Sequence, residues 1–74
     1  MKLPRISGQK ILHALGKAGF EEVHIRGSHH YLYHSTKDRI VTVPVHSQKI
    51  IAPKTLKSIL EQADVSVEDF LDFL

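Results

Sequence analysis

The 74-residue chain contains no cysteine, no tryptophan and no long hydrophobic run. The absence of cysteine excludes a disulfide framework and a cysteine-based zinc site, and it fits a reducing compartment. No stretch approaches the roughly 20 apolar residues of a membrane-spanning helix. The start Met1-Lys2 leads into sequence without an apolar segment, so we expect no signal peptide. The length of 74 residues leaves room for a single domain, residues 1–74. Together with the absences, it predicts a small cytoplasmic protein with no membrane partner.

Acidic residues are almost missing from the first three quarters of the chain. Residues 1–57 hold all ten Lys and Arg side chains and only three acidic ones, which gives a net charge of +7. Residues 58–74 hold five acidic residues and no basic one. A basic body of this kind suggests a polyanionic partner. The alternative is a solvated surface on which the two signs happen to segregate.

Apolar residues recur at helical spacing in three segments, and each segment has a start signal. Ser7 and Ser66 are favourable N-caps for the first and the third, and Pro53 fits the first turn of the second. The apolar tail at the end of the chain is expected to pack on the domain or on a partner. The predicted helices cover residues 7–18, residues 54–63 and a short segment after Ser66, with apolar stripes at Ile11, Leu12, Leu15, Ala18, Leu56, Ile59, Leu60, Ala63 and Phe70.

The apolar period changes to two residues in the middle of the chain, as in strands. Val23 and Ile25 alternate with polar residues, and further strands are predicted over residues 29–34 and 40–45. Pro44 cannot donate a ladder hydrogen bond, so the third strand should lie at an edge or end there. Short connections favour an antiparallel meander. The order therefore predicts an α+β fold, a three-stranded antiparallel sheet with helices on one face.

Alternation along the strands assigns their side chains to two faces. The face expected to pack on the helices carries Val23, Ile25, Leu32, Val41, Val43 and Val45. The other face, which we call the open face, carries His24, Arg26, His29, Tyr31, Tyr33 and Thr42. RNA-binding surfaces use this mixture, because phosphates attract cations while unstacked bases pack on rings. Ordinary cross-strand packing of the two tyrosines is the alternative.

Gly27-Ser28 reads as a turn in front of two histidines, with His29 on the open face and His30 on the helix side. RNA can be cut without a metal when a base removes the proton of a 2′-hydroxyl, which then attacks the adjacent phosphate. Histidine fits this role because its unperturbed pKa, about 6.5, allows proton exchange near neutral pH. We interpret His29 as the candidate base and a nearby cation, Arg26, Lys54 or Lys57, as the group that stabilises the transition state.

Further candidate RNA contacts are spread over the turn, the sheet and the second helix. Lys54 and Lys57 fall in the first turns of that helix, where free N–H groups attract phosphate. A solvated helix face is the alternative reading of these two lysines. The complete predicted RNA-binding set is Arg26, Ser28, Tyr31, Lys49, Lys54 and Lys57.

Most of the other histidines have ordinary interpretations, whereas His46 is left open between a hydrogen bond to loop backbone and a position beside the substrate. His30 and His34 share a face with Leu32, so we expect them to be partly buried and hydrogen-bonded. Five of the six histidines lie in residues 24–46, but their spacing scatters them over both faces and no acidic cluster joins them. Metal binding is therefore disfavoured, and no cofactor is expected.

Five blocks follow one another along nearly the whole chain: KAGF at 17–20, RGSHH at 26–30, VTVPVH at 41–46, TLKSILEQA at 55–63 and SVEDFL at 66–71. In this order and spacing they resemble the HicA family of small mRNA-interferase toxins from toxin–antitoxin pairs. The resemblance implies a double-stranded-RNA-binding-like α-β-β-β-α fold with a short extra C-terminal helix. It also implies an RNA-cleaving activity that halts translation and a HicB-type antitoxin that covers the active site.

The resemblance also implies that the histidine after Gly-Ser, here His29, is catalytic. Two positions depart from the pattern: residues 47–52 are more apolar than the usual glycine-containing loop, and Asp64 stands where Gly is frequent. Two readings of another class remain open. One is a module that binds RNA without cutting it, and the other is an interaction protein whose acidic, apolar tail docks a partner.

Overall fold

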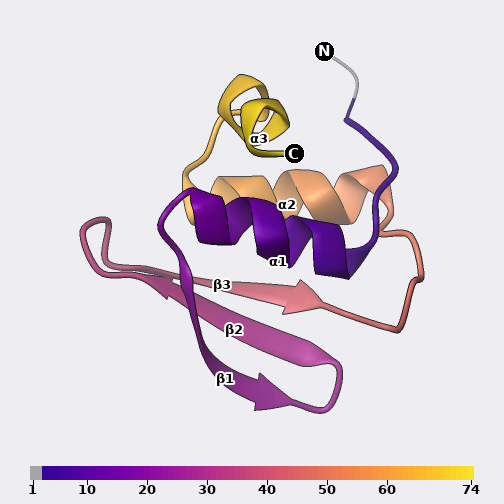
Figure 1. Cartoon of the computed structure of the whole chain (residues 1–74), viewed down its shortest axis with the longest axis horizontal. Helices are drawn as coiled ribbons and strands as arrows, with labels where there is room; N and C mark the ends of the chain where they lie inside the picture. The colour runs from indigo at the N-terminus through magenta and orange to yellow at the C-terminus, as the bar shows by residue number, and fades with distance from the viewer. Residues whose placement is uncertain (1–2) are drawn as a thin grey trace.

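The computed structural model describes residues 3–74 and shows a three-stranded sheet with its helices on one side (Figure 1). Met1 and Lys2, the start considered for a signal peptide, lie outside the described residues. The antiparallel order β1-β2-β3 confirms the predicted α+β meander. The elements are α1 (Gly8–Lys17), β1 (Glu21–Arg26), β2 (His29–His34), β3 (Arg39–Pro44), α2 (Pro53–Ala63) and α3 (Val67–Phe73).

The helices begin where the sequence predicts. The Ser7 hydroxyl accepts a hydrogen bond from the Lys10 N–H at 3.4 Å, and the Ser66 hydroxyl accepts one from the Asp69 N–H at 3.1 Å. The helix α2 has no side-chain cap at its start and relies on Pro53. Among residues 3–74 no helix has both the length and the apolar content that crossing a membrane requires.

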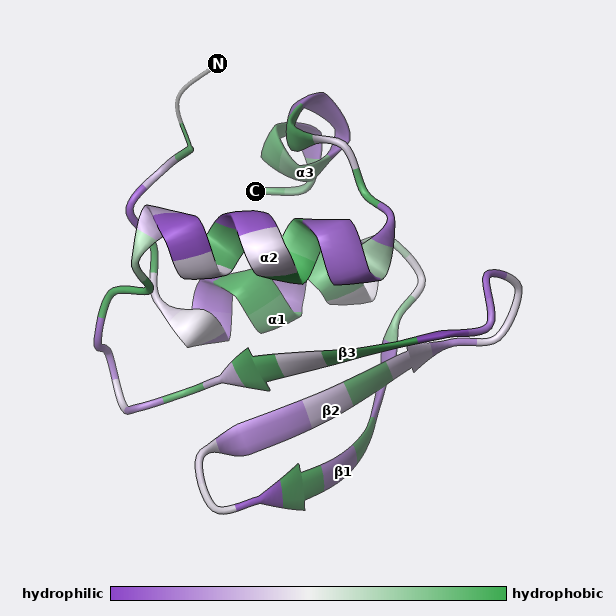
Figure 2. Cartoon of the chain, turned by 180° about the vertical axis from the view of Figure 1, so that it is seen from behind, coloured by the Kyte–Doolittle hydropathy of each residue, from purple (hydrophilic) through white to green (hydrophobic). Residues whose placement is uncertain are grey.

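The core lies between the helices and the two strands β2 and β3. Both long helices pack on β3, and α3 packs on α1 and contributes the fully buried Phe70 to the core. Hydrophobic and hydrophilic segments alternate along the helices, as an inner apolar face requires (Figure 2). The predicted apolar stripes are buried, except that Leu12 and Ala18 are only half-buried. Phe70 confirms that the C-terminal tail packs on its own domain.

The predicted burial of β1 is wrong. Val23 and Ile25 were expected to face the helices, but they are 55% and 51% exposed. The helices pack on β3 at the opposite edge of the sheet, so β1 extends beyond the cover that they provide (Figure 1). The register also shifts between Glu22 and His24, which breaks the regular alternation at Val23. Alternation alone could not reveal how far the helices reach across the sheet.

Both departures from the family pattern have a structural explanation. In the loop 46–52, Ile51 is buried and its N–H donates to the Ile6 carbonyl at 2.8 Å, so an apolar residue there completes the core. Asp64 ends α2 with a left-handed φ of 55°, a conformation that glycine adopts most easily. The Lys37 ammonium donates to the Asp64 carbonyl at 2.7 Å and holds this end of the helix.

Gly8 lies where α1 approaches the end of β3 closely. A Cβ at this position would stand 2.5 Å from the Pro44 carbonyl oxygen and 3.0 Å from a methyl of Val45. We expect Gly8→Ala to lower the free energy of unfolding by about 1–3 kcal/mol, because backbone must move. The matched control is Gly16→Ala in the same helix, where a Cβ meets nothing within 4 Å.

Gly16→Ala should raise the free energy of unfolding by about 0.5–1 kcal/mol through helix propensity alone. Urea unfolding of both variants measures the difference. Equal effects of the two substitutions would show that the approach of α1 to β3 is not tight.

Candidate functional site

The turn between β1 and β2 is held by both neighbouring strands. Arg26 pairs with His29 across a two-residue turn in which Gly27 has a φ of 60° and Ser28 has no positive φ, the pattern of a type II′ turn. The Ser28 carbonyl accepts a hydrogen bond from the Val45 N–H at 2.7 Å. His29 therefore projects from a turn that is attached to the end of β3, with its side chain exposed.

The open face carries the predicted polar and aromatic mixture. Cross-strand partners share a face, and the register aligns Arg26 with His29 and Tyr31 with both His24 and Thr42. The rings of His24 and Tyr31 lie 5.6 Å apart, centroid to centroid, at an interplanar angle of 38°. The RNA contacts predicted from the sequence leave out His24, although strand alternation places it on the open face. The regular pairing that starts at the two-residue turn brings it opposite Tyr31.

His30 and His34 are structural, as predicted. The His30 Nδ1 lies 2.7 Å from a carboxylate oxygen of Glu22, and this contact joins β1 to β2 on the helix side. His34 accepts a hydrogen bond from the Lys37 N–H at 3.1 Å and packs edge-on against Phe20, with centroids 5.0 Å apart. Both rings are therefore engaged on the face opposite to that of His29.

Tyr33 is not a second candidate base on the open face. Its hydroxyl donates to the Asp38 carboxylate at 2.9 Å. This hydrogen bond, together with the negative charge of Asp38, raises the pKa of Tyr33 above that of an ordinary tyrosine. The phenol therefore stays protonated near neutral pH and cannot accept a proton from a substrate hydroxyl.

The predicted lysines divide between two places. Lys49 in the loop before α2 and Lys54 in its first turn are both exposed. This loop and the start of α2 lie at the same end of the molecule as the β1–β2 turn (Figure 1). Lys57 is also exposed but lines a groove that it shares with Glu61 and Asp64 and that leads toward α3. The structure thus brings Lys49 and Lys54 to the end that holds His29, and it places Lys57 beside two carboxylates.

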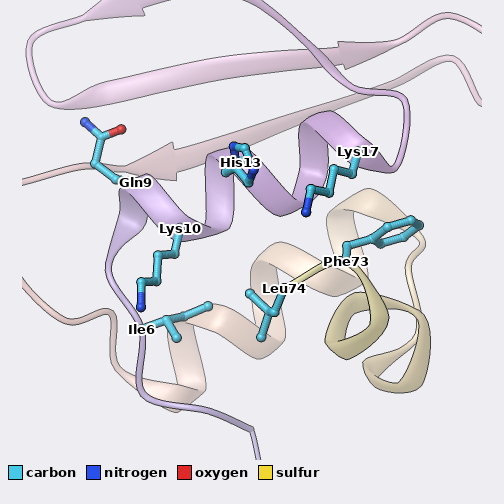
Figure 3. A pocket seen from close by; sticks show the side chains of 7 residues that line it. All are labelled: Ile6, Gln9, Lys10, His13, Lys17, Phe73 and Leu74. Carbon is cyan, nitrogen blue, oxygen red and sulfur yellow. The ribbon is translucent and has the colours of Figure 1, made fainter.

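A separate cavity of about 450 Å³ lies between α1 and the end of α3, on the helical side of the molecule (Figure 3). Its lining includes Lys10, His13 and Lys17 on one side and the apolar Phe73 and Leu74 on the other. None of the predicted site residues lines it. Within residues 3–74 no group of three or more His, Asp or Glu side chains is arranged to hold a metal ion.

The sequence matches the family model of the HicA toxin of bacterial toxin–antitoxin systems over residues 8–65. The chain belongs to the HicA toxin family. It is therefore a toxin of a toxin–antitoxin system, and its family implies a cognate antitoxin as partner. The match runs from the start of α1 to the second residue after the end of α2 and contains every predicted site residue, whereas α3 lies beyond it. A comparison with curated proteins gave no match.

In this HicA toxin, Gly27 sets the direction in which His29 leaves the turn. A Cβ at Gly27 meets nothing within 4 Å, so the cost of Gly27→Ala comes from its positive φ and not from a clash. We expect the free energy of unfolding to fall by about 1–2 kcal/mol. Urea unfolding measures this loss, and Gly16→Ala again serves as the control because its φ is not positive. An unchanged stability would mean that the turn relaxes to another type.

Proposed function

We propose that this HicA toxin is a metal-independent endoribonuclease that cleaves mRNA in the cytoplasm, with His29 as the general base. The observation that carries the proposal is the exposed His29 on a turn held at both ends, opposite Arg26 on a basic and aromatic face. By contrast, the rings of His30 and His34 are held by contacts with Glu22 and with the Lys37 N–H. His29 is left free to reach a substrate.

The proposed reaction is an internal transesterification. The imidazole of His29 takes the proton of a ribose 2′-hydroxyl, and the oxygen attacks the adjacent phosphorus. The bond from phosphorus to the 5′-oxygen breaks, that oxygen takes a proton from water, and His29 returns the proton it accepted to the solvent. The products are a 2′,3′-cyclic phosphate and a 5′-hydroxyl end. Arg26 lies across the turn from His29, where its guanidinium would stabilise the negative charge that develops on the phosphate oxygens.

The lysines would bind the phosphates on either side of the cleaved bond. Lys49 and Lys54 lie at the end of the molecule that holds the turn, whereas Lys57, further along α2, lines the groove with Glu61 and Asp64 and would contact RNA only beyond that end. The Ser28 carbonyl is occupied by Val45, so Ser28 would contact RNA through its hydroxyl. A HicB-type antitoxin would inhibit the toxin by covering the turn and the open face.

Incubation of the purified protein with RNA in the presence of EDTA tests this function. The proposal predicts cleavage with 2′,3′-cyclic phosphate ends, and no loss of rate when EDTA is added. A protein that binds RNA but leaves it intact would be the non-catalytic module. Because several phosphates are bound, the affinity should also fall as salt rises. A flat dependence on salt would point to an interaction protein with an incidental basic face.

A further inference from the structure

We propose that His24 and Tyr31 form a stacking subsite for one unpaired base, next to the phosphate that is cleaved. The inference rests on the proposed function, and it specifies the substrate as RNA that is single-stranded at the cleavage site. A duplex keeps its bases stacked on one another and cannot offer a base face to a protein ring. A chain with a fold similar to double-stranded-RNA-binding domains would thus act on unpaired RNA through its open face.

The two rings lie beside the candidate base on the same face of the sheet. Tyr31 follows His29 by two residues along β2, so their Cα atoms are separated by about 6.8 Å along the strand. His24 is the cross-strand partner of Tyr31, and its ring centroid lies 5.6 Å from that of Tyr31. The tilt of 38° between the rings leaves them neither parallel nor perpendicular. One nucleotide can connect the phosphate at His29 with a base at Tyr31.

The charges favour Tyr31 over the other tyrosine of the open face. The cross-strand partners of Tyr31 are His24 on β1 and Thr42 on β3, so no carboxylate lies opposite it, and His29 precedes it by two residues on β2. Tyr33 donates its hydroxyl to Asp38, so a carboxylate lies against the tyrosine that is farther from His29. A phosphate chain is attracted to the first ring and repelled from the second. The same polarity directs the RNA toward His29.

The subsite is tested by binding and not by cleavage. Homopolymeric 2′-O-methyl RNA oligonucleotides, one for each base, cannot be cut by attack of a 2′-hydroxyl and report affinity alone. We expect Tyr31→Ala to weaken their binding by about 5- to 150-fold, the range for one base stacked on an aromatic ring. Tyr31→Phe keeps the ring and should bind like the wild type. His24→Ala should cause a smaller loss, and Tyr33→Ala a change of less than about threefold.

Blunt 2′-O-methyl RNA duplexes of the same length provide the second arm. They should bind more weakly than the single strands, and Tyr31→Ala should not change their affinity. The subsite is refuted if Tyr31→Ala binds single strands like the wild type, or if Tyr31→Phe loses as much affinity as Tyr31→Ala. It is also refuted if the wild type prefers the duplex or fails to bind the single strands. Circular dichroism of each variant verifies that the fold is kept.

Failure of the subsite and failure of the endoribonuclease are separable. Cleavage of unmodified RNA in EDTA by a protein whose affinity does not depend on Tyr31 would preserve the function and remove the subsite. Binding that depends on Tyr31, without any cleavage, would preserve the subsite and remove the function. Binding is measured with 2′-O-methyl RNA and cleavage with unmodified RNA, so the two measurements are independent of each other.

Discussion

The substitution His29→Ala is expected to relieve the growth arrest that expression of the wild-type toxin causes. Removal of a positioned histidine that acts as general base typically slows a reaction by about 10²- to 10⁴-fold. Cells continuously replace their mRNA, so a loss of this size in cleavage should restore growth. Growth curves after induction, with the protein level measured in the same cultures, show the effect.

The same variant should remain folded. The His29 side chain is exposed, and none of the hydrogen bonds found among residues 3–74 involves its ring. Its truncation should therefore change the free energy of unfolding by less than about 0.5 kcal/mol. His13→Ala is the matched control, because His13 is an exposed histidine on α1, away from the sheet. That variant should still arrest growth, whereas arrest by a folded His29→Ala protein would rule out His29 as the base.

Phe70→Ala is expected to cause the largest loss of stability. Phe70 is the largest of the fully buried side chains among the described residues. It anchors the seven-residue helix α3 to the core. Replacement of a buried phenylalanine by alanine costs about 3–5 kcal/mol. A domain of this length has a total stability of about 4–11 kcal/mol. The variant should therefore lose much of its fold near room temperature.

Urea unfolding of Phe70→Ala and Phe73→Ala distinguishes a core anchor from a loosely attached tail. Phe73 belongs to the same helix but is only half-buried at the rim of the cavity beside α1. Its replacement should cost clearly less than that of Phe70. Similar losses from the two variants would show that α3 is not part of the cooperative core. Such a result would also support the alternative that this C-terminal tail docks a partner.

The local elements of the fold could be predicted because their signals are local. Ser7, Pro53 and Ser66 mark helix starts, and the structure uses all three in that way. Pro44 ends β3 at the edge of the sheet, as its missing N–H requires. The burial of β1 could not be predicted, because it depends on where the helices lie across the sheet. The family match over residues 8–65 agrees with the resemblance inferred from the sequence blocks.

The arrangement of the candidate site could be predicted in part. Strand alternation separates the exposed His29 from His30, which contacts Glu22 on the other face. The hydrogen bond from Val45 to Ser28 was not predictable, since it joins segments far apart in the sequence. By contrast, helical spacing already places Glu61 and Asp64, at i+4 and i+7, on the same face as Lys57, and the predicted RNA-binding set overlooked these carboxylates. The spacing of residues along the sequence determines on which face of its own helix or strand a side chain lies. Which other elements contact that face depends on tertiary packing.

Single-turnover cleavage of one RNA oligonucleotide in EDTA, with protein in excess and RNA fully bound, tests the central claim most directly. The measurement separates the chemical step from binding, so it reports what His29 contributes to the reaction itself. We predict that His29→Ala binds the RNA like the wild type and cleaves it at least about 100-fold more slowly, whereas His13→Ala matches the wild type. Cleavage by the folded His29→Ala variant at the wild-type rate would contradict the account.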